Sequence, residues 1–129
     1  MEETSVLQLD FGKLDKLSGV LPVAVQNADT GEVILVAYTN EAAFHRAMSG
    51  RRLILWSTSR GELWEKGATS GETFEIVDAF VNCEQNSLLY RVRPKRGGIC
   101  HTKNRAGHPR NCFYRRIDPD TMTLENLDP

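Results

Sequence analysis

All three cysteines of the chain lie between residues 83 and 112, and they constrain its fold and chemistry more than any other feature. An odd number of thiols cannot pair completely in disulfides, and a cytoplasmic protein keeps its thiols reduced in any case. Cys83 lies between Val81 and Leu88, where a small buried hydrophobe would fit. Cys100 and Cys112 instead lie among glycines, lysines and arginines, which favours metal binding or catalysis for these two.

Thiolates are soft ligands that zinc prefers, and three protein ligands leave a fourth position on the metal open for water. We therefore predict that Cys83, Cys100 and Cys112 hold one catalytic zinc ion. The alternative is a structural zinc with four protein ligands, the fourth supplied by His101 or His108. That alternative describes a non-catalytic module that binds RNA or a phosphorylated ligand.

Basic residues are concentrated around the second and third cysteines. The formal net charge is only −1, which argues against a general affinity for nucleic acid. However, residues 91–116 contain nine lysines or arginines and no acidic residue, whereas residues 1–49 carry seven acidic residues against three basic ones. Such a segment in an otherwise acidic chain predicts a local anion-binding surface, the ordinary alternative being a solvated loop.

Length and composition are typical of an ordinary globular protein. The 129 residues predict one domain, with a core over residues 20–117 and a polar tail over residues 118–129. No apolar run reaches the roughly 20 residues that a membrane span requires, and the acidic N-terminus lacks the apolar core of a signal peptide. We therefore expect a cytoplasmic protein with no membrane association.

Hydrophobic periodicity predicts an α+β fold dominated by its sheet, with about seven strands and two short helices. The first helix is expected over residues 10–17, and the second from Thr39 or Asn40 to Ser49, with Gly50 directly after its end. The strands are expected at residues 21–28, 32–38, 52–58, 63–64, 73–83, 87–93 and 113–117. Residues 33–37 are apolar throughout, which predicts a central strand covered on both faces.

Two loops, at residues 57–61 and 66–71, each combine hydroxyl groups, glycines and one cation. Small residues let backbone N–H groups approach an anion, and the cation adds charge. Loops of this composition are mostly ordinary turns, but a phosphate site is the functional alternative. The substrate-binding candidates in them are Ser57, Arg60, Lys66, Thr69 and Ser70.

Six pieces of sequence occur in a specific order. They are the runs Leu35–Ala42, Trp56–Gly61 and Leu63–Gly71, followed by Cys83, Cys100-His101-Thr102 and Cys112-Phe113. This ordered set resembles the phosphoribosyl-AMP cyclohydrolase family of histidine biosynthesis. The resemblance extends over residues 20–117, and the set is far more specific than any single piece.

This resemblance implies that water opens the six-membered adenine ring of phosphoribosyl-AMP, a purine ribotide with two phosphates. It also implies zinc, magnesium and an intertwined homodimer whose active site lies at the subunit interface. Cys83 of one subunit would bind zinc together with Cys100 and Cys112 of the other, and His101 would carry protons. The chemistry agrees, because zinc lowers the pKa of bound water from about 16 to about 7, and histidine titrates at about 6.5.

The chain departs from the family's pattern at three places. The family's usual Asp-Cys-Asp-x-Asp run is Asn82–Asn86 here, so Glu84 is the only carboxylate left there as a magnesium ligand, which predicts a poor magnesium site. The loop between the second and third cysteines is longer and brings His108, and Ala68 stands where the family commonly has Glu. These changes preserve the zinc ligands and leave open a divergent relative that hydrolyses another phosphorylated purine.

Overall fold

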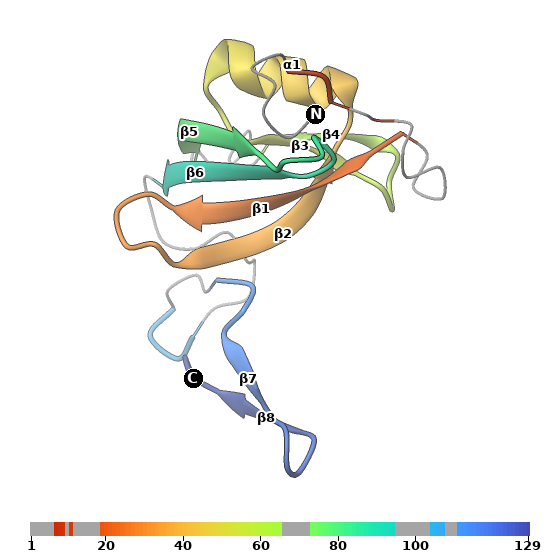
Figure 1. The fold of residues 1–129 in the computed structure, drawn as a ribbon. Helices are drawn as coiled ribbons and strands as arrows, with labels where there is room; N and C mark the ends of the chain where they lie inside the picture. The colour runs from red at the N-terminus through yellow and green to blue at the C-terminus, as the bar shows by residue number, and fades with distance from the viewer. Residues whose placement is uncertain (1–6, 10, 12–18, 66–72, 95–103, 108–110) are drawn as a thin grey trace.

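The computed structural model describes residues 7–9, 11, 19–65, 73–94, 104–107 and 111–129. In chain order, the elements are β1 (Leu21–Asn27), β2 (Val33–Thr39), α1 (Glu41–Gly50), β3 (Ile54–Ser57), β4 (Glu62–Glu65), β5 (Phe74–Val81), β6 (Leu88–Pro94), β7 (Arg115–Asp118) and β8 (Thr123–Asn126). Helix α1 covers one side of the main sheet, and the β7–β8 hairpin extends away on the other side (Figure 1). The fold is therefore α+β and dominated by its sheet, as predicted, with one helix in the described part.

Six strands form the main sheet, in the order β4-β3-β2-β1-β6-β5. Neighbouring strands are antiparallel except for β1 and β6, which run parallel, with Val23 opposite Leu88 and Asn27 opposite Val92. This parallel pairing joins the β1–β2 hairpin to the β5–β6 hairpin. It therefore unites the two halves of the sheet.

The turn between β1 and β2 forms where the sequence predicts it. Asn27 accepts hydrogen bonds at Oδ1 from the N–H groups of Asp29 (2.8 Å) and Thr30 (3.2 Å). Gly31 has a φ of +78°, a left-handed conformation that glycine adopts without steric strain. The strands predicted at residues 21–28 and 32–38 are confirmed, and this turn joins them.

Helix α1 begins as predicted and ends one residue later. Asn40 is its N-cap, and the side-chain oxygen of Asn40 accepts from the N–H of Ala43 at 2.9 Å. Gly50 is still helical, and Arg51 takes the left-handed conformation with a φ of +54°. This conformation costs a non-glycine residue about 1 kcal/mol. The Arg51 carbonyl accepts a hydrogen bond from the N–H of Ile76 at 2.8 Å, and this bond to β5 holds the strained residue in place.

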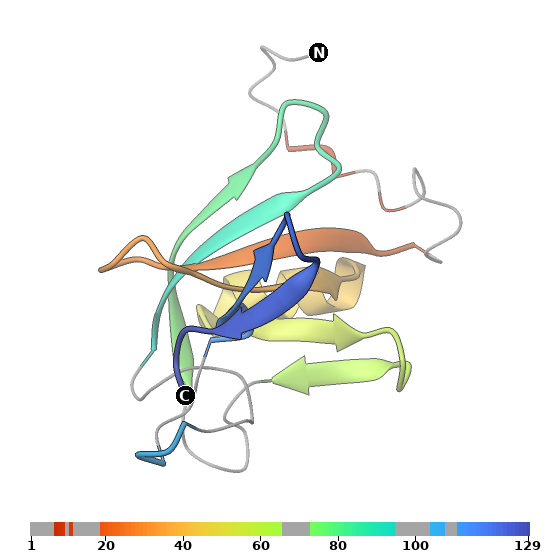
Figure 2. The ribbon, with the colours of Figure 1, turned by 90° about the horizontal axis from the view of Figure 1, so that it is seen from below.

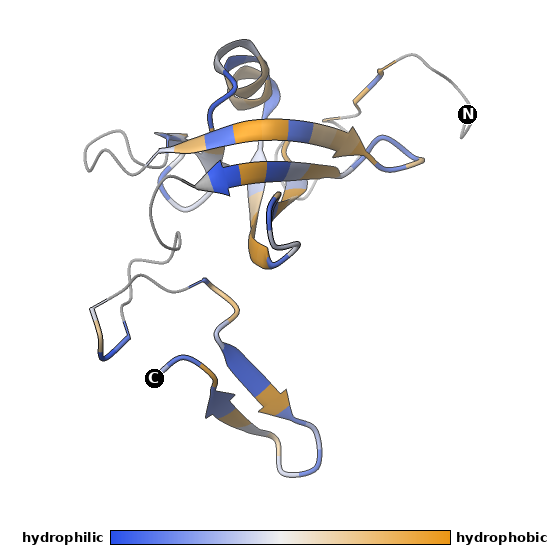
Figure 3. Ribbon diagram, turned by 90° about the vertical axis from the view of Figure 1, so that its left-hand side faces the viewer, coloured by the Kyte–Doolittle hydropathy of each residue, from blue (hydrophilic) through white to orange (hydrophobic). Residues whose placement is uncertain are grey.

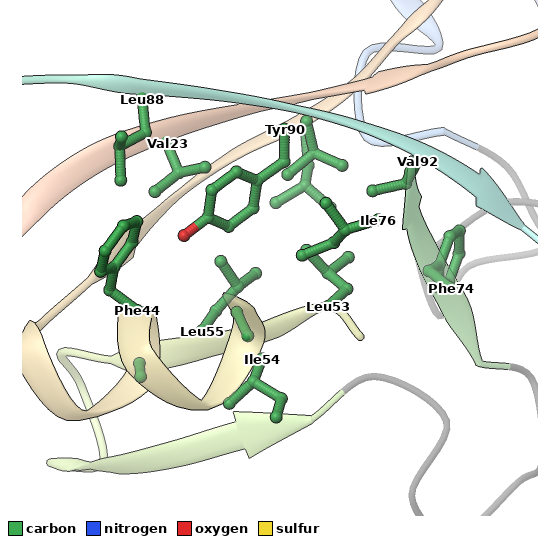
Figure 4. Packing of buried hydrophobic residues seen from close by; sticks show 14 of the residues in the cluster. Val23, Phe44, Leu53, Ile54, Leu55, Phe74, Ile76, Leu88, Tyr90 and Val92 are labelled. Carbon is green, nitrogen blue, oxygen red and sulfur yellow. The ribbon is translucent and has the colours of Figure 1, made fainter. Parts of the chain in front are cut away.

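The hydrophobic core lies between α1 and the face of the sheet that α1 covers (Figure 4). Alternate residues of β1 and β6 point into it, as expected for strands with one covered face. These residues are Val23, Val25, Leu88, Tyr90 and Val92. From α1, the buried residues are Ala43, Phe44 and Ala47, with Met48 partly buried beside them.

The structure differs from the expected strands in two places. The expected polar tail over residues 118–129 contains β8, which pairs with β7, so the described residues form eight strands. Every residue of β8 is exposed, and hydrophobic periodicity therefore gave no signal for it. Strand β2 is not covered on both faces, because Val33 and Val36 are 46% and 57% exposed. The helix expected over residues 10–17 falls outside the described residues, except for Phe11.

Tyr90 is fully buried, and its hydroxyl has no hydrogen-bond partner of normal geometry in the described part of the chain. Burial raises the pKa of Tyr90 far above its usual value, and the nearby Thr39 side chain offsets this shift only in part. Because Tyr90→Phe removes this poorly satisfied polar group and keeps the ring, we expect the free energy of unfolding in urea to stay unchanged or rise by about 1 kcal/mol.

The control variant is Tyr90→Leu, which also removes ring volume from the core and should lower the free energy of unfolding by about 2 kcal/mol. If the free energy of unfolding of Tyr90→Phe falls by more than about 1 kcal/mol, the hydroxyl makes a good hydrogen bond in the folded protein.

Candidate functional site

The structure describes half of the residues singled out from the sequence. Cys83, Glu84, Ser57, Arg60 and Cys112 are described. The other predicted site residues, Cys100, His101, Lys66, Thr69 and Ser70, fall outside the described residues, as do Ala68 and His108.

Cys83 is exposed and lies in the turn that joins β5 to β6. Asn82 closes this turn, since its Oδ1 accepts from the N–H groups of Asn86 (2.9 Å) and Ser87 (3.0 Å). The two asparagine side chains also bond to each other at 2.6 Å, and Asn86 Nδ2 donates to Glu84 Oε2 at 3.2 Å. The side-chain amides of Asn82 and Asn86 therefore hold the turn together, and Glu84 is its one carboxylate.

Cys112 is also exposed and lies directly before the β7–β8 hairpin region. Its backbone N–H donates to the carbonyl of Ile34 on β2 at 3.0 Å. The neighbouring side chain of Asn111 donates to Glu32 Oε1. These two contacts attach the third cysteine to the end of the sheet where β1 turns into β2.

The turn between β1 and β2 is itself attached to the end of β6. The Arg93 guanidinium donates to both carboxylate oxygens of Asp29, with distances of 3.1 to 3.3 Å. These hydrogen bonds lower the pKa of the Asp29 carboxyl and raise that of Arg93. Both side chains are exposed, so the pair serves mainly to orient the turn.

Cys83 and Cys112 lie at opposite ends of the strands they flank. Val81 pairs with Leu88 and Leu88 with Val23, whereas Ile34, which holds Cys112, lies beyond Val25 at the far end of β1. With a rise of about 3.3 Å per residue and about 4.8 Å between strands, this register separates the two cysteines by on the order of 15 Å. Figure 2 shows the β5–β6 turn at one end of the molecule and residues 104–107 at the other.

Two thiolates on one zinc ion, each about 2.3 Å from the metal, lie about 4 Å apart. The thiols of Cys83 and Cys112 within one copy of the chain are therefore too far apart to share a zinc ion. Among the residues that the structure describes, no group of three or more His, Cys, Asp or Glu side chains could hold a metal ion. Thiolates are suitable ligands for zinc. However, Cys83 and Cys112 could bind the same zinc ion only if they belong to different copies of the chain.

The predicted phosphate-binding loop at residues 57–61 forms a compact turn between β3 and β4. Ser57 Oγ accepts from the backbone N–H (3.3 Å) and Nε (3.4 Å) of Arg60 and lies 3.4 Å from Ser59 Oγ. Arg60 also lies 3.5 Å from Glu62, and its side chain remains 59% exposed. Two hydroxyls and one guanidinium therefore gather at this turn, an arrangement that suits either an anion or an ordinary turn.

A shallow hollow of about 500 Å³ between α1 and β3 was not anticipated from the sequence. Its lining includes His45, Arg46 and Arg52, with Glu65 3.5 Å from Arg52. Glu65 directly precedes the second predicted phosphate-binding loop in the sequence. The sequence shows basic residues on either side of Ser49-Gly50, but it does not show that they lie close together. They do so because the chain reverses direction after α1.

Comparisons with known proteins support one family. The family model for phosphoribosyl-AMP cyclohydrolase matches residues 35–114. A phosphoribosyl-AMP cyclohydrolase of Hyphomonas neptunium is 43% identical over 95% of this chain and 86% of its own length. One of Halobacterium salinarum is 42% identical over 100% of this chain and 97% of its own. A histidine biosynthesis bifunctional protein of Thermus thermophilus is 42% identical over 77% of this chain and 44% of its own length.

The similar proteins are cyclohydrolases, a class of hydrolases. The chain belongs to the phosphoribosyl-AMP cyclohydrolase family. The resemblance inferred from the ordered pieces of sequence is thereby confirmed. No helix in the described ranges is long and apolar enough to cross a membrane.

Proposed function

We propose that this chain opens the adenine ring of phosphoribosyl-AMP by hydrolysis, in the cytoplasm, as a step of histidine biosynthesis. The observation that carries this proposal is similarity over nearly the full length to relatives that bear the name of this activity. The chain also keeps the three cysteines and the Cys100-His101 pair that the proposed chemistry requires.

Cys83, Cys100 and Cys112 would hold one zinc ion, which supplies a nucleophile at neutral pH because it lowers the pKa of water to about 7. His101 would carry a proton to the departing ring nitrogen. Ser57, Arg60, Lys66, Thr69 and Ser70 would bind the substrate, with the cations facing its phosphates. Glu84 is the candidate magnesium ligand of the β5–β6 turn, and a single carboxylate makes a weak site for this ion.

The distance between Cys83 and Cys112 supports a homodimer with shared sites. If one copy supplies Cys83 and the other supplies Cys112, a twofold axis generates two equivalent sites per dimer. Each site is then incomplete without the partner.

The β7–β8 hairpin supports the same proposal, because one of its faces is apolar and exposed. Ile117 lies opposite Leu124, and both are exposed, as is Met122 at the turn. In Figure 3, apolar and polar stretches alternate along the strands of this hairpin. A two-stranded hairpin is marginally stable alone in water, so this one needs a surface to pack against.

The main sheet offers such a surface on the side away from α1. Its register places Val36, Ala24, Leu89 and Phe80 side by side across β2, β1, β6 and β5. Val36 and Phe80 are 57% and 50% exposed, so this row is apolar and open to contact. We propose that the hairpin of each copy packs its Ile117–Leu124 face against this row of its partner.

The mixing of two inactive variants tests both the activity and the shared site. Cys83→Ser and Cys112→Ser should each abolish ring opening of phosphoribosyl-AMP, because each removes a thiolate from every site. Refolded together in equal amounts, half of the dimers are mixed and each mixed dimer keeps one intact site, so about a quarter of wild-type turnover should return.

Two outcomes are distinguishable in this experiment. If wild-type protein opens phosphoribosyl-AMP but the mixture stays inactive, the thiols come from one copy and the shared site is wrong. If wild-type protein shows no preference for phosphoribosyl-AMP over AMP, the proposed substrate is wrong.

Leu124→Glu tests the packing of the hairpin, because it places a charge on the apolar face. We expect sedimentation velocity to show a shift from dimer to monomer, together with loss of turnover. Thr123→Glu is the matched control, since it puts the same charge on the opposite face of the same exposed strand. A dimer unaffected by Leu124→Glu would contradict this use of the hairpin.

A further inference from the structure

The C-terminal end of the chain contacts the segment between the second and third cysteines. Asn104 Nδ2 donates a hydrogen bond to Asp128 Oδ1 at 2.9 Å, across 24 positions of sequence. Asp128 is half-buried, whereas residues 119–127 and Pro129 are all exposed. Partial burial of Asp128 among exposed neighbours indicates a specific contact.

Two further hydrogen bonds hold Asp128 in place. The N–H of Leu127 donates to the carbonyl of Tyr114 at 2.9 Å, which continues the hairpin beyond its last strand pair, Arg115–Asn126. The N–H of Asp128 donates to Asn126 Oδ1 at 2.8 Å. The backbone that presents the Asp128 carboxylate is therefore fixed on both sides of Leu127.

Cys112 lies inside the loop that these contacts close. The segment from Asn104 to Tyr114 is attached at its two ends to Asp128 and Leu127, and in between Cys112 bonds to Ile34 on β2. These contacts therefore restrain the described chain on both sides of Cys112.

We propose that Asp128 is a positioning residue, which acts through Asn104 to hold the Cys112 segment in the arrangement that metal binding needs. The inference rests on the proposed function, since it concerns the zinc ligands. A segment that is already ordered loses less conformational freedom when it binds. Residues that orient metal ligands typically change metal affinity by about 10- to 100-fold when they are replaced.

The test compares Asp128→Ala with Asp120→Ala, which removes the same charge from an exposed position of the same tail. We expect Asp128→Ala to weaken zinc binding about 10-fold in competition with a chromophoric chelator. Hydrogen exchange of the Cys112 amide in the metal-free protein should also become faster, because the bond from this amide to Ile34 loses its support. Asp120→Ala should change neither quantity.

An exchange of the two side chains provides the rescue. Asn104→Asp alone places two carboxylates together and should behave like Asp128→Ala. Asn104→Asp combined with Asp128→Asn restores a donor and an acceptor in the reverse direction, so zinc affinity and Cys112 exchange should return to wild-type values. A general loss of stability would not be repaired in this way.

The proposal is overturned if Asp128→Ala leaves zinc affinity and Cys112 exchange at wild-type values, or if the exchanged pair fails to restore them. If wild-type protein binds no zinc, the proposed metal site is wrong. The exchange rate of the Cys112 amide then still decides whether Asp128 holds this segment.

Discussion

The parallel pairing of β1 with β6 determines the geometry of everything that bears on function in this chain. Parallel neighbours begin at the same end of a sheet, so the turn that leads into β6 lies at the end where β1 starts. The turn that leads out of β1 lies at the opposite end. Cys83 belongs to the first turn, and Cys112 is attached beside the second. Five paired positions between β1 and β6 therefore keep the two thiols apart, and no side-chain rotation can bring them together within one copy.

The local parts of the fold could be predicted from the sequence, because each is determined by residues that are close together in the chain. The hairpin of β1 and β2 follows from two apolar runs around Asp29-Thr30-Gly31, and α1 begins at Asn40 because its side chain satisfies a backbone N–H. The family also follows from ordered sequence alone. Strand β8 escaped prediction because nothing in it is buried, and sequence patterns report burial more directly than they report hydrogen bonding.

The long-range parts could not be predicted in this way. The pairing of β1 with β6 joins residues more than 60 positions apart, and no feature of either strand specifies a parallel partner. The apolar run of β2 predicted cover on both faces, but Val33 and Val36 are exposed on the side of the sheet away from α1. The exposure of Val36 is what the proposed dimer explains. The contact between Asn104 and Asp128 likewise joins two polar residues that are far apart in the sequence. Nothing in their residue types indicates that they form a pair.

Residues 111–129 differ in kind from the rest of the described chain. The main sheet and α1 share one core, whereas the β7–β8 hairpin buries little and is attached by hydrogen bonds near its base. In our account this hairpin performs two tasks: its apolar face joins two copies, and its last residues order the segment that carries Cys112. Both tasks serve one site that is assembled from two chains.

Diffraction from crystals of the zinc-loaded protein, measured on both sides of the zinc absorption edge, tests this account most directly. The account predicts an anomalous peak between two copies, within about 2.3 Å of Cys83 from one and of Cys112 from the other. A peak bound by thiols of a single copy, or a zinc-loaded protein whose metal lies away from these cysteines, would contradict it.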